Sequence, residues 1–403
     1  MPSTAAVLHI SLLVLQVFFY ISPPFPGRRF LCVTTITLLA IAPHFVGPVS
    51  DKPGDAQPYG LLWPIYLSTL DKFLFTNANG PEESYWRADR PAREAMAMRS
   101  FGPRKIKWAA AMMFNTRGVR WNWEVKNLPP KPRASKRYFL LSQTFVFFKM
   151  LFMSDVLLQL SERLFWTPRD GQPRFLDSKY LTVTHPDWRW SFFKVLVFAC
   201  GPYFFVNMQY AAAAVIAVLL NLSKPEDWPP YFGDVKEVTT VRHFWGSFWH
   251  QTLRRSLTKA TGFVVDVLRI PRGSNLSSYT QIWLAFAISG LMHTQFFVLL
   301  PYPSNINFSE RTMGVMAFFM WQAAAITLED FVQWVWCKSG GSVEKSNWFK
   351  TVIGYSWVLG SFWISLPWVA DVMMRIRLTE ESFLGFSVVR EWVQMIPLPP
   401  KHD

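Results

Sequence analysis

Residues 195–223 read VLVFACGPYFFVNMQYAAAAVIAVLLNLS, a run that contains no charged side chain. Four other stretches of about 20 residues or more also lack a formal charge: 4–27, 30–50, 273–309 and 351–370. A helix needs about 20 apolar residues to cross the hydrocarbon core of a bilayer. The strands of a membrane β-barrel are about half as long and alternate in hydrophobicity. The sequence therefore predicts an all-α, polytopic membrane helix bundle.

The composition excludes several other classes of protein. Of the 403 residues, 51% are hydrophobic and 17% are charged, against about 25% charged in an average soluble domain. An ordinary soluble enzyme and a disordered chain are therefore excluded. The formal net charge of +14 favours anionic headgroups or an anionic substrate, and nucleic acid is a poor candidate partner for a chain with so many spans. The three cysteines lie in apolar segments and predict neither disulfides nor a metal site.

We expect about seven to nine transmembrane helices in a single domain that covers residues 1–403. The predicted spans are 5–22, 30–48, 58–76, 138–160, 190–222, 280–300, 312–337 and 351–371. The segment 190–222 is long enough for either one tilted crossing or two short ones, with Gly201-Pro202 as the break.

The charges in the loops favour a single crossing for 190–222. The loop 77–137 holds fourteen Lys and Arg residues against five acids. The positive-inside rule places this loop, and the Gly27-Arg28-Arg29 turn, in the cytoplasm. A single crossing at 190–222 then also places the basic loop 223–279 in the cytoplasm, where it would form a cytoplasmic or interfacial element. The segment 280–371 would hold the C-terminal spans.

His293 is the first candidate for chemistry. It lies in the sequence SGLMH (289–293), inside the uncharged stretch 273–309. An ionisable side chain at that depth usually faces a bundle interior or a cavity and marks a functional site. The alternative is a structural histidine that forms a hydrogen bond between helices. His9, His44, His185 and His402 have no suitable neighbours in the sequence.

The second candidate is the aromatic and basic segment RHFWGSFWHQTLRR, residues 242–255. Read as one helix, it places Phe244, Phe248 and Gln251 on one stripe and Trp245, Trp249 and Thr252 on the next. Such a helix between spans is typical of an interfacial or re-entrant element. It could be a membrane anchor without chemistry, although His250 among the aromatic side chains argues for function.

Two further groups of residues are less informative. The segment FNTRGVRWNWE (114–124) could line a ligand entrance or form a lid over the bundle mouth. The predicted spans also contain charges at Asp71, Lys149, Asp155, Lys194 and Glu329-Asp330. For these charges we favour polar contacts between helices over catalysis.

Taken together, three stretches resemble the wax-synthase-like branch of the membrane-bound O-acyltransferase superfamily, in its fungal secondary-metabolism form. They are FNTRGVRWNWEVKN (114–127), WPPYFGDVKEVTTVRHFWGSFWHQ (228–251) and SGLMH (289–293). The similarity extends over roughly residues 110–370. Ser247 departs from the pattern, because a basic residue is expected at that position.

The resemblance implies an acyltransferase that works in a reaction chamber inside the bilayer, most often in the endoplasmic reticulum. It implies an acyl-CoA donor, with acetyl-CoA as the first choice, and a hydrophobic alcohol acceptor such as a terpenoid or meroterpenoid. It implies no permanently bound cofactor and no metal. By this similarity His293 is the general base, and His250 orients the thioester or stabilises charge on its carbonyl. The binding candidates are Trp249, Gln251, Arg242, Arg254, Arg255, Lys259, Asn115, Arg117, Trp121 and Asn122.

Two other functions are compatible with a polytopic helical chain. A membrane cyclase of terpenes or prenyl chains would use acids such as Asp71, Glu329 or Asp330 and would not need His293. A transporter of pathway intermediates would bind without turnover and would favour inverted repeats. The sequence contains no visible repeat.

Overall fold

The computed structural model describes residues 3–50, 52–60, 62–77, 80–166, 181–300, 306–341, 348–376 and 385–400. Within these ranges every regular element is a helix, and the only β pairing is an isolated bridge between Arg87 and Trp121. The predicted all-α class is therefore confirmed. The chain divides into two compact units, Met1–Asn127 with Gln251–Pro301 and Leu128–His250 with Tyr302–Asp403.

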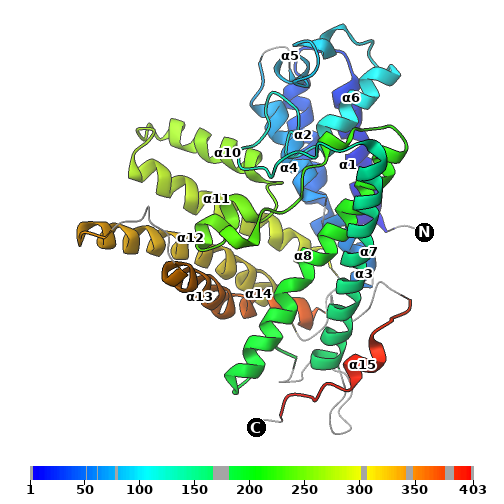
Figure 1. Cartoon of the computed structure of the whole chain (residues 1–403). Coiled ribbons are helices and arrows are strands. Elements are labelled where there is room, and N and C mark those ends of the chain that lie inside the picture. Colours follow the sequence, from blue (N-terminus) through cyan, green and yellow to red (C-terminus); the bar gives the residue numbers. More distant parts are fainter. Residues whose placement is uncertain are drawn as a thin grey trace. The chain divides into compact units, whose positions relative to one another are not determined.

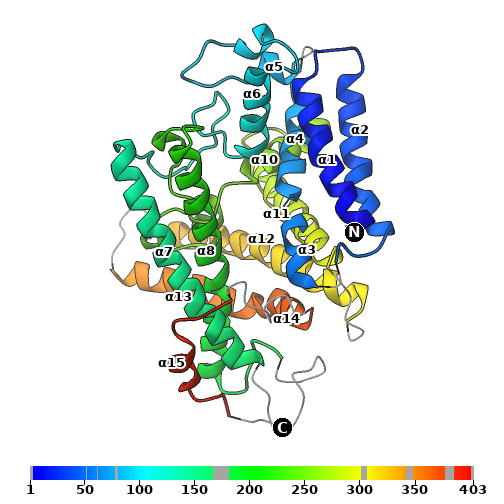
Figure 2. The same ribbon diagram turned by 90° about the vertical axis from the view of Figure 1, so that its right-hand side faces the viewer.

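The first unit is built from two helical pairs and several short helices. Its helices are α1 (Thr4–Ile21), α2 (Arg28–Ile41), α3 (Pro53–Gly60), α4 (Trp63–Leu74), α5 (Pro81–Ser84), α6 (Pro103–Phe114), α10 (Arg254–Val267) and α11 (Asn275–Val298), with 3-10 turns at Ala42–Phe45 and Glu94–Ala97. Helices α1 and α2 run antiparallel and side by side (Figure 2). Helix α10 packs against α11 and also contacts α4.

Local sequence signals explain the start and end of α1. The Ser3 side chain accepts a hydrogen bond from the backbone N–H of Ala6 and caps the helix. The helix ends one residue before Ser22, and the Pro23-Pro24 sequence that follows disfavours further helical turns. The next turn passes through Gly27, whose positive φ of 83° glycine adopts without strain, and α2 begins immediately after it.

Helix α4 buries polar side chains in the core of the first unit. Ser68, Thr69, Asp71 and Lys72 are each at most 4% exposed. A helix with buried polar groups is stable only where those groups have partners. Lys72 has three: its Nζ donates to Ser68 Oγ at 2.6 Å and to the Met112 carbonyl at 2.8 Å, and lies 4.4 Å from the Trp123 ring centre.

The second unit contains the longest helices. Its helices are α7 (Lys136–Ser161), continued by a π turn (Glu162–Trp166), α8 (Trp188–Leu219), α9 (Val241–His243), continued by a π turn (Phe244–Phe248), α12 (Phe308–Lys338), α13 (Trp348–Ser365), α14 (Pro367–Arg375) and α15 (Arg390–Gln394), with 3-10 turns at Pro225–Asp227 and Val235–Glu237. Helices α7 and α8 form an antiparallel pair (Figure 1). Helix α8 continues through Pro202 without a break and ends at Leu219, so the predicted span 190–222 contains one helix, as a single crossing requires.

The number of long apolar helices is lower than the predicted seven to nine. In the described part of the chain, five helices are long and apolar enough to cross a membrane: α1, α7 with its π turn, α8, α11 and α12. The pair α13 and α14, bent by 41°, is a candidate for a sixth. The predicted spans 30–48 and 58–76 are not continuous helices, because α2 gives way to a 3-10 turn at Ala42–Phe45, which contains Pro43, and because α3 ends at Gly60 whereas α4 begins at Trp63.

Candidate functional site

His293 lies near the end of α11 in the first unit and is half-buried. Its Nδ1 lies 2.7 Å from the backbone carbonyl oxygen of Ser289. A carbonyl can only accept, so Nδ1 carries the proton in this contact and a neutral ring has its lone pair on Nε2. A hydrogen bond of this kind fixes both the tautomer and the ring orientation of a histidine. The imidazole is therefore held in the form that can take a proton at Nε2.

His250 lies in the second unit within a nest of aromatic rings. Its ring centre is 5.5 Å from that of Trp249, 5.7 Å from Tyr231 and 6.2 Å from Phe232. Trp249 packs in turn against Phe232 at 4.9 Å. The neighbours come from two parts of the chain, 228–233 and 244–250, so the sequence stretch 228–251 folds back on itself around this histidine.

A close backbone approach at Gly233 makes this packing possible. Its N–H donates to the Phe248 carbonyl at 2.8 Å. A side chain at this position would place its Cβ 2.7 Å from the Ser247 carbonyl oxygen and 3.0 Å from the Phe248 Cα. Only glycine fits there without a shift of backbone.

The segment 242–255 is not one helix. The prediction that its aromatic and polar side chains form two stripes along one helix is therefore wrong. Helix α9 passes into a π turn that ends at Phe248, where the Trp249 N–H donates to the Phe244 carbonyl at 2.7 Å. Trp249 is extended, and α10 begins only at Arg254. Gln251 and Thr252 therefore do not share a helical face with the aromatic residues before them. Single π turns of this type are frequent at functional sites.

Helix α12 holds the start of this segment through Glu329. The carboxylate of Glu329 accepts the backbone N–H groups of Val241 and Arg242, the second at 3.0 Å. Seven residues earlier on the same helix, Gln322 accepts the indole N–H of Trp245 at 3.2 Å. The side chain of Arg242 pairs with Asp330 at 2.5 Å. Residues 241–245 are thus attached to α12 at points two helical turns apart.

The basic residues that follow His250 belong to the first unit and have different environments. Gln251 is buried, and its Oε1 accepts from Arg254 Nη1 at 2.7 Å. Arg255 donates from Nε to Asp71 at 3.0 Å and from Nη2 to the Tyr85 hydroxyl at 2.8 Å. Burial raises the pKa of Tyr85 to about 12, so this hydroxyl stays protonated. Lys259 is exposed on α10.

Arg255 also completes a group of aromatic and cationic side chains. Its guanidinium lies 5.0 Å from the Tyr85 ring centre and 5.2 Å from the Trp123 ring centre. Lys72 lies over the same Trp123 ring. Cations over aromatic faces are stabilising, more so when they are desolvated. The group therefore links the segment 114–127 to α4 and α10.

The polar residues of 114–124 form a compact turn. Asn115 makes two 3.0 Å hydrogen bonds to the backbone of Val119, and Asn122 bonds the Trp86 N–H at 3.2 Å and the Ser84 carbonyl at 2.9 Å. Arg117 and Trp121 are 5% and 3% exposed. Asn115 therefore bonds backbone within its own turn, and Asn122 attaches that turn to residues 84–86, which is the geometry of a folded lid or support.

Three groupings of residues in the structure were not expected from the sequence. Asp71 and Arg255 are separated by 184 positions, and Glu329 and Val241 by 88. His9, which has no suitable neighbours in sequence, bonds the Tyr66 hydroxyl through Nδ1 at 2.9 Å in the fully buried core of the first unit. The only signal in the sequence was a polar or charged residue inside an apolar segment.

These features describe a multi-pass helical membrane protein with a candidate base inside a spanning helix. Residues 228–321 match the membrane bound O-acyl transferase family, and residues 135–219 match the C-terminal domain of aspirochlorine biosynthesis protein F.

Three fungal relatives show the extent of the similarity. Aspirochlorine biosynthesis protein F of Aspergillus oryzae is 41% identical over 54% of this chain and 85% of its own length. Acetyltransferase ple2 of Rhodocybe pseudopiperita is 29% identical over 82% of each chain. Acetyltransferase pyr8 of Aspergillus fumigatus is 32% identical over 66% of this chain and 63% of its own length. The chain belongs to the membrane bound O-acyl transferase family and is an acetyltransferase of this type.

Proposed function

We propose that this protein transfers the acetyl group of acetyl-CoA to a hydroxyl group of a hydrophobic secondary metabolite, such as a terpenoid or meroterpenoid alcohol. The observation that carries the proposal is the His293 ring, held by the Ser289 carbonyl with Nε2 as its basic nitrogen. The named acetyltransferases among the relatives support the acetyl group and the class of pathway.

The proposed chemistry begins with His293 as general base. Its Nε2 takes the hydroxyl proton as the acceptor oxygen attacks the thioester carbonyl carbon. The C–S bond of the tetrahedral intermediate then breaks, and the departing CoA thiolate receives the proton from the imidazolium. The products are the acetate ester and free CoA, with no net gain or loss of protons. A chamber inside the bilayer would exclude the water that would otherwise hydrolyse the thioester.

We assign the donor side of the reaction to the segment around His250. The aromatic nest of Tyr231, Phe232 and Trp249 supports a role in orienting the thioester, with His250 stabilising charge on its carbonyl oxygen. Lys259, exposed on α10, and Arg254 are candidates for the CoA phosphates. Arg255, bonded to Asp71 and Tyr85, fits better as a support for α10.

The contacts of the carboxylates argue against the cyclase alternative. A cyclase needs a carboxylic acid that donates a proton to its substrate. Asp71 accepts from Arg255 and Ser256, Glu329 accepts three N–H groups, and Asp330 pairs with Arg242. These protein donors occupy the carboxylate oxygens and by themselves favour the ionised form of a carboxyl group, whereas burial raises the pKa of Asp71. The transporter alternative does not explain membership of an acyltransferase family.

The decisive experiment compares wild type with His293→Gln and His293→Ala in microsomes supplied with radiolabelled acetyl-CoA and an extract of terpenoid alcohols. Loss of a general base is expected to lower the rate of ester formation by about 100-fold or more. His185→Ala, a histidine in a loop of the second unit, is the matched control and should retain wild-type activity. Wild-type turnover in His293→Gln would overturn the base assignment.

Two outcomes address the donor and the compartment. If wild type forms labelled ester from a long-chain acyl-CoA but not from acetyl-CoA, the donor assignment is wrong. We also propose residence in the endoplasmic reticulum, with acetyl-CoA reaching the protein from the cytoplasm. Sedimentation of the tagged protein with another membrane fraction would overturn that placement.

A further inference from the structure

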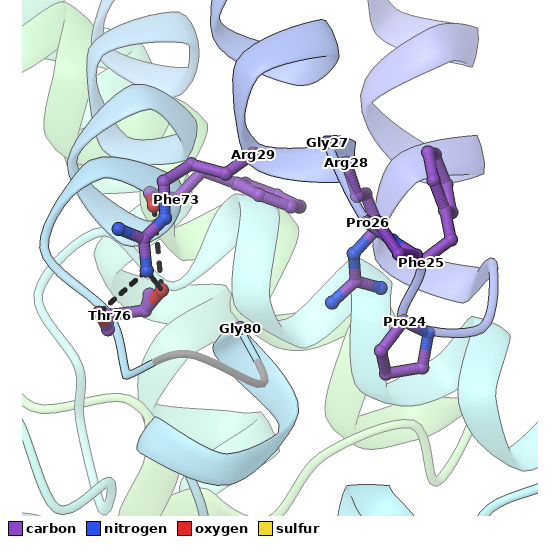
Figure 3. Close-up of a pocket in the computed structure, with 9 residues that line it drawn as sticks. All are labelled: Pro24, Phe25, Pro26, Gly27, Arg28, Arg29, Phe73, Thr76 and Gly80. Carbon is purple, nitrogen blue, oxygen red and sulfur yellow. Dashed lines mark hydrogen bonds between the residues drawn. The ribbon is translucent and has the colours of Figure 1, made fainter.

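A pocket opens in the first unit where α2 begins, away from any residue assigned above. Its volume is about 130 Å³ (Figure 3). It is lined by Pro24, Phe25, Pro26, Gly27, Arg28, Arg29, Phe73, Thr76 and Gly80. Two of these nine residues are arginines and none is an acid. The lining therefore attracts anions.

The wall of the pocket includes a buried charge that is only partly compensated. Arg28, 4% exposed, forms a bidentate pair with Glu82 at 2.6 and 2.8 Å. Lys105, 2% exposed, bonds the same carboxylate at 3.0 Å. Two cations share one anion, so this buried group carries a net charge of +1. Buried charge without a counterion is costly, and an anion beside it lowers that cost.

Arg29 adds a second positive charge to the lining of the pocket. Only its Nη2 is bonded within the described part of the chain, to the carbonyl oxygens of Thr76 at 2.9 Å and Asn77 at 3.0 Å. Figure 3 shows the Arg29 side chain extending past Phe73 toward Thr76, where its hydrogen bonds are drawn, while the Arg28 side chain extends from the start of α2 in a different direction. The planar fork of an arginine matches the oxygens of a phosphate group.

Apolar surfaces lead to the pocket from both neighbouring helices. On α1, Val7, Val14 and Phe18 recur at helical spacing and are 45–62% exposed. On α2, Phe30 and Leu38 are 76% and 62% exposed. Phe25, in the pocket lining itself, is 39% exposed. These surfaces suit the acyl chains of lipid, so the pocket lies where the headgroup of an adjacent lipid would be.

We propose that this pocket binds a phosphate group, and that an anionic phospholipid of the cytoplasmic leaflet supplies it. The positive-inside rule places the Gly27-Arg28-Arg29 turn on the cytoplasmic side, where anionic lipids are enriched. Basic pockets between membrane helices on that side are established headgroup sites in other proteins. The bound lipid would compensate the net charge of Arg28, Glu82 and Lys105 and tie α2 to α4.

The test measures lipid binding to the purified full-length protein by native mass spectrometry and by the midpoint of thermal unfolding. The probes are dioleoyl phosphatidic acid, dioleoyl phosphatidylcholine and inorganic phosphate. Wild type should bind phosphatidic acid in preference to phosphatidylcholine, and phosphatidic acid should raise the midpoint. Arg29→Gln should weaken the binding of phosphatidic acid about fivefold, the equivalent of about 1 kcal/mol for one arginine near the membrane surface.

Two control variants keep the test specific. Arg29→Lys retains the charge and should restore most of the binding. Arg104→Gln removes the same charge from an exposed position of α6 outside the pocket lining, and should bind like wild type. Equal binding of the two lipids by wild type would overturn the proposal, as would equal losses in Arg29→Gln and Arg104→Gln. If inorganic phosphate alone raises the midpoint as much as phosphatidic acid, the lipid source is wrong.

Discussion

The indole Nε1–H of Trp357 donates to the carboxylate of Glu329 at 2.7 Å, which joins α13 to α12 through a buried charge. The same carboxylate accepts two backbone N–H groups at the start of α9. One side chain therefore connects two long helices to the segment that leads into His250. Removing it leaves three N–H donors without their acceptor.

The first prediction concerns this carboxylate. Glu329→Ala should destabilise the protein by about 2–3 kcal/mol, because hydrogen bonds to a charged acceptor are strong and their loss leaves buried donors unpaired. The midpoint of thermal unfolding measures the effect. Asp330→Asn, which removes a partly exposed ion pair, should cost under about 1 kcal/mol. Equal losses in the two variants would contradict the role given to Glu329.

The second prediction concerns the buried charges of α4. Asp71→Asn leaves Arg255 and the fully buried Lys72 without their nearest anion, and should cost about 3–5 kcal/mol. Adding Lys72→Met to Asp71→Asn removes one of the two cations and should recover part of that loss. Thermal unfolding of the two single variants and the double variant gives the coupling energy. Simple additivity would show that the two side chains do not interact.

The third prediction uses two glycines of the second unit. Gly233→Ala should destabilise by about 1–3 kcal/mol, because the new methyl group meets the Ser247 backbone and forces a shift. Acetyl transfer should fall as well, since that shift occurs beside Trp249 and His250. Gly246→Ala is the control, because no atom lies within 4 Å of the position its Cβ would occupy. The prediction fails if Gly246→Ala is as damaging as Gly233→Ala.

The fourth prediction separates His250 from its neighbour in the same segment. His250→Ala should raise KM for acetyl-CoA and lower kcat, as expected for a residue that orients the donor. His243→Ala, at a partly exposed position 3.7 Å from Glu237, should change either constant by less than about twofold, as for most surface substitutions. Steady-state kinetics in microsomes with varied acetyl-CoA provide the comparison. Wild-type constants in His250→Ala would assign the aromatic nest to packing alone.

The long spans were predictable because their signal is local. A predominantly apolar run of 18 or more residues has few alternatives to a spanning helix. The predicted spans 5–22, 138–160, 190–222 and 312–337 each correspond to one long helix, although the last three contain charged residues. The helices at 30–48 and 58–76 are shorter than predicted, since hydropathy does not register the 3-10 turn that contains Pro43 or the end of α3 at Gly60. The prediction of a single helix over 242–255 is wrong, because neither a π turn nor an extended backbone at Trp249 can be recognised from the spacing of aromatic residues.

Composition and pattern by themselves determined the helical class, the membrane environment, and His293 and His250 as the residues to examine. Only the tertiary structure decided which polar side chains form hydrogen bonds with one another, because the partners are far apart in the sequence. Arg255 and Asp71, for example, are separated by 184 positions. It also decided the His293 tautomer, through the distance from Nδ1 to the Ser289 carbonyl. Hydrophobicity is a property of each residue in turn, whereas the pairing of buried charges depends on which helices pack together.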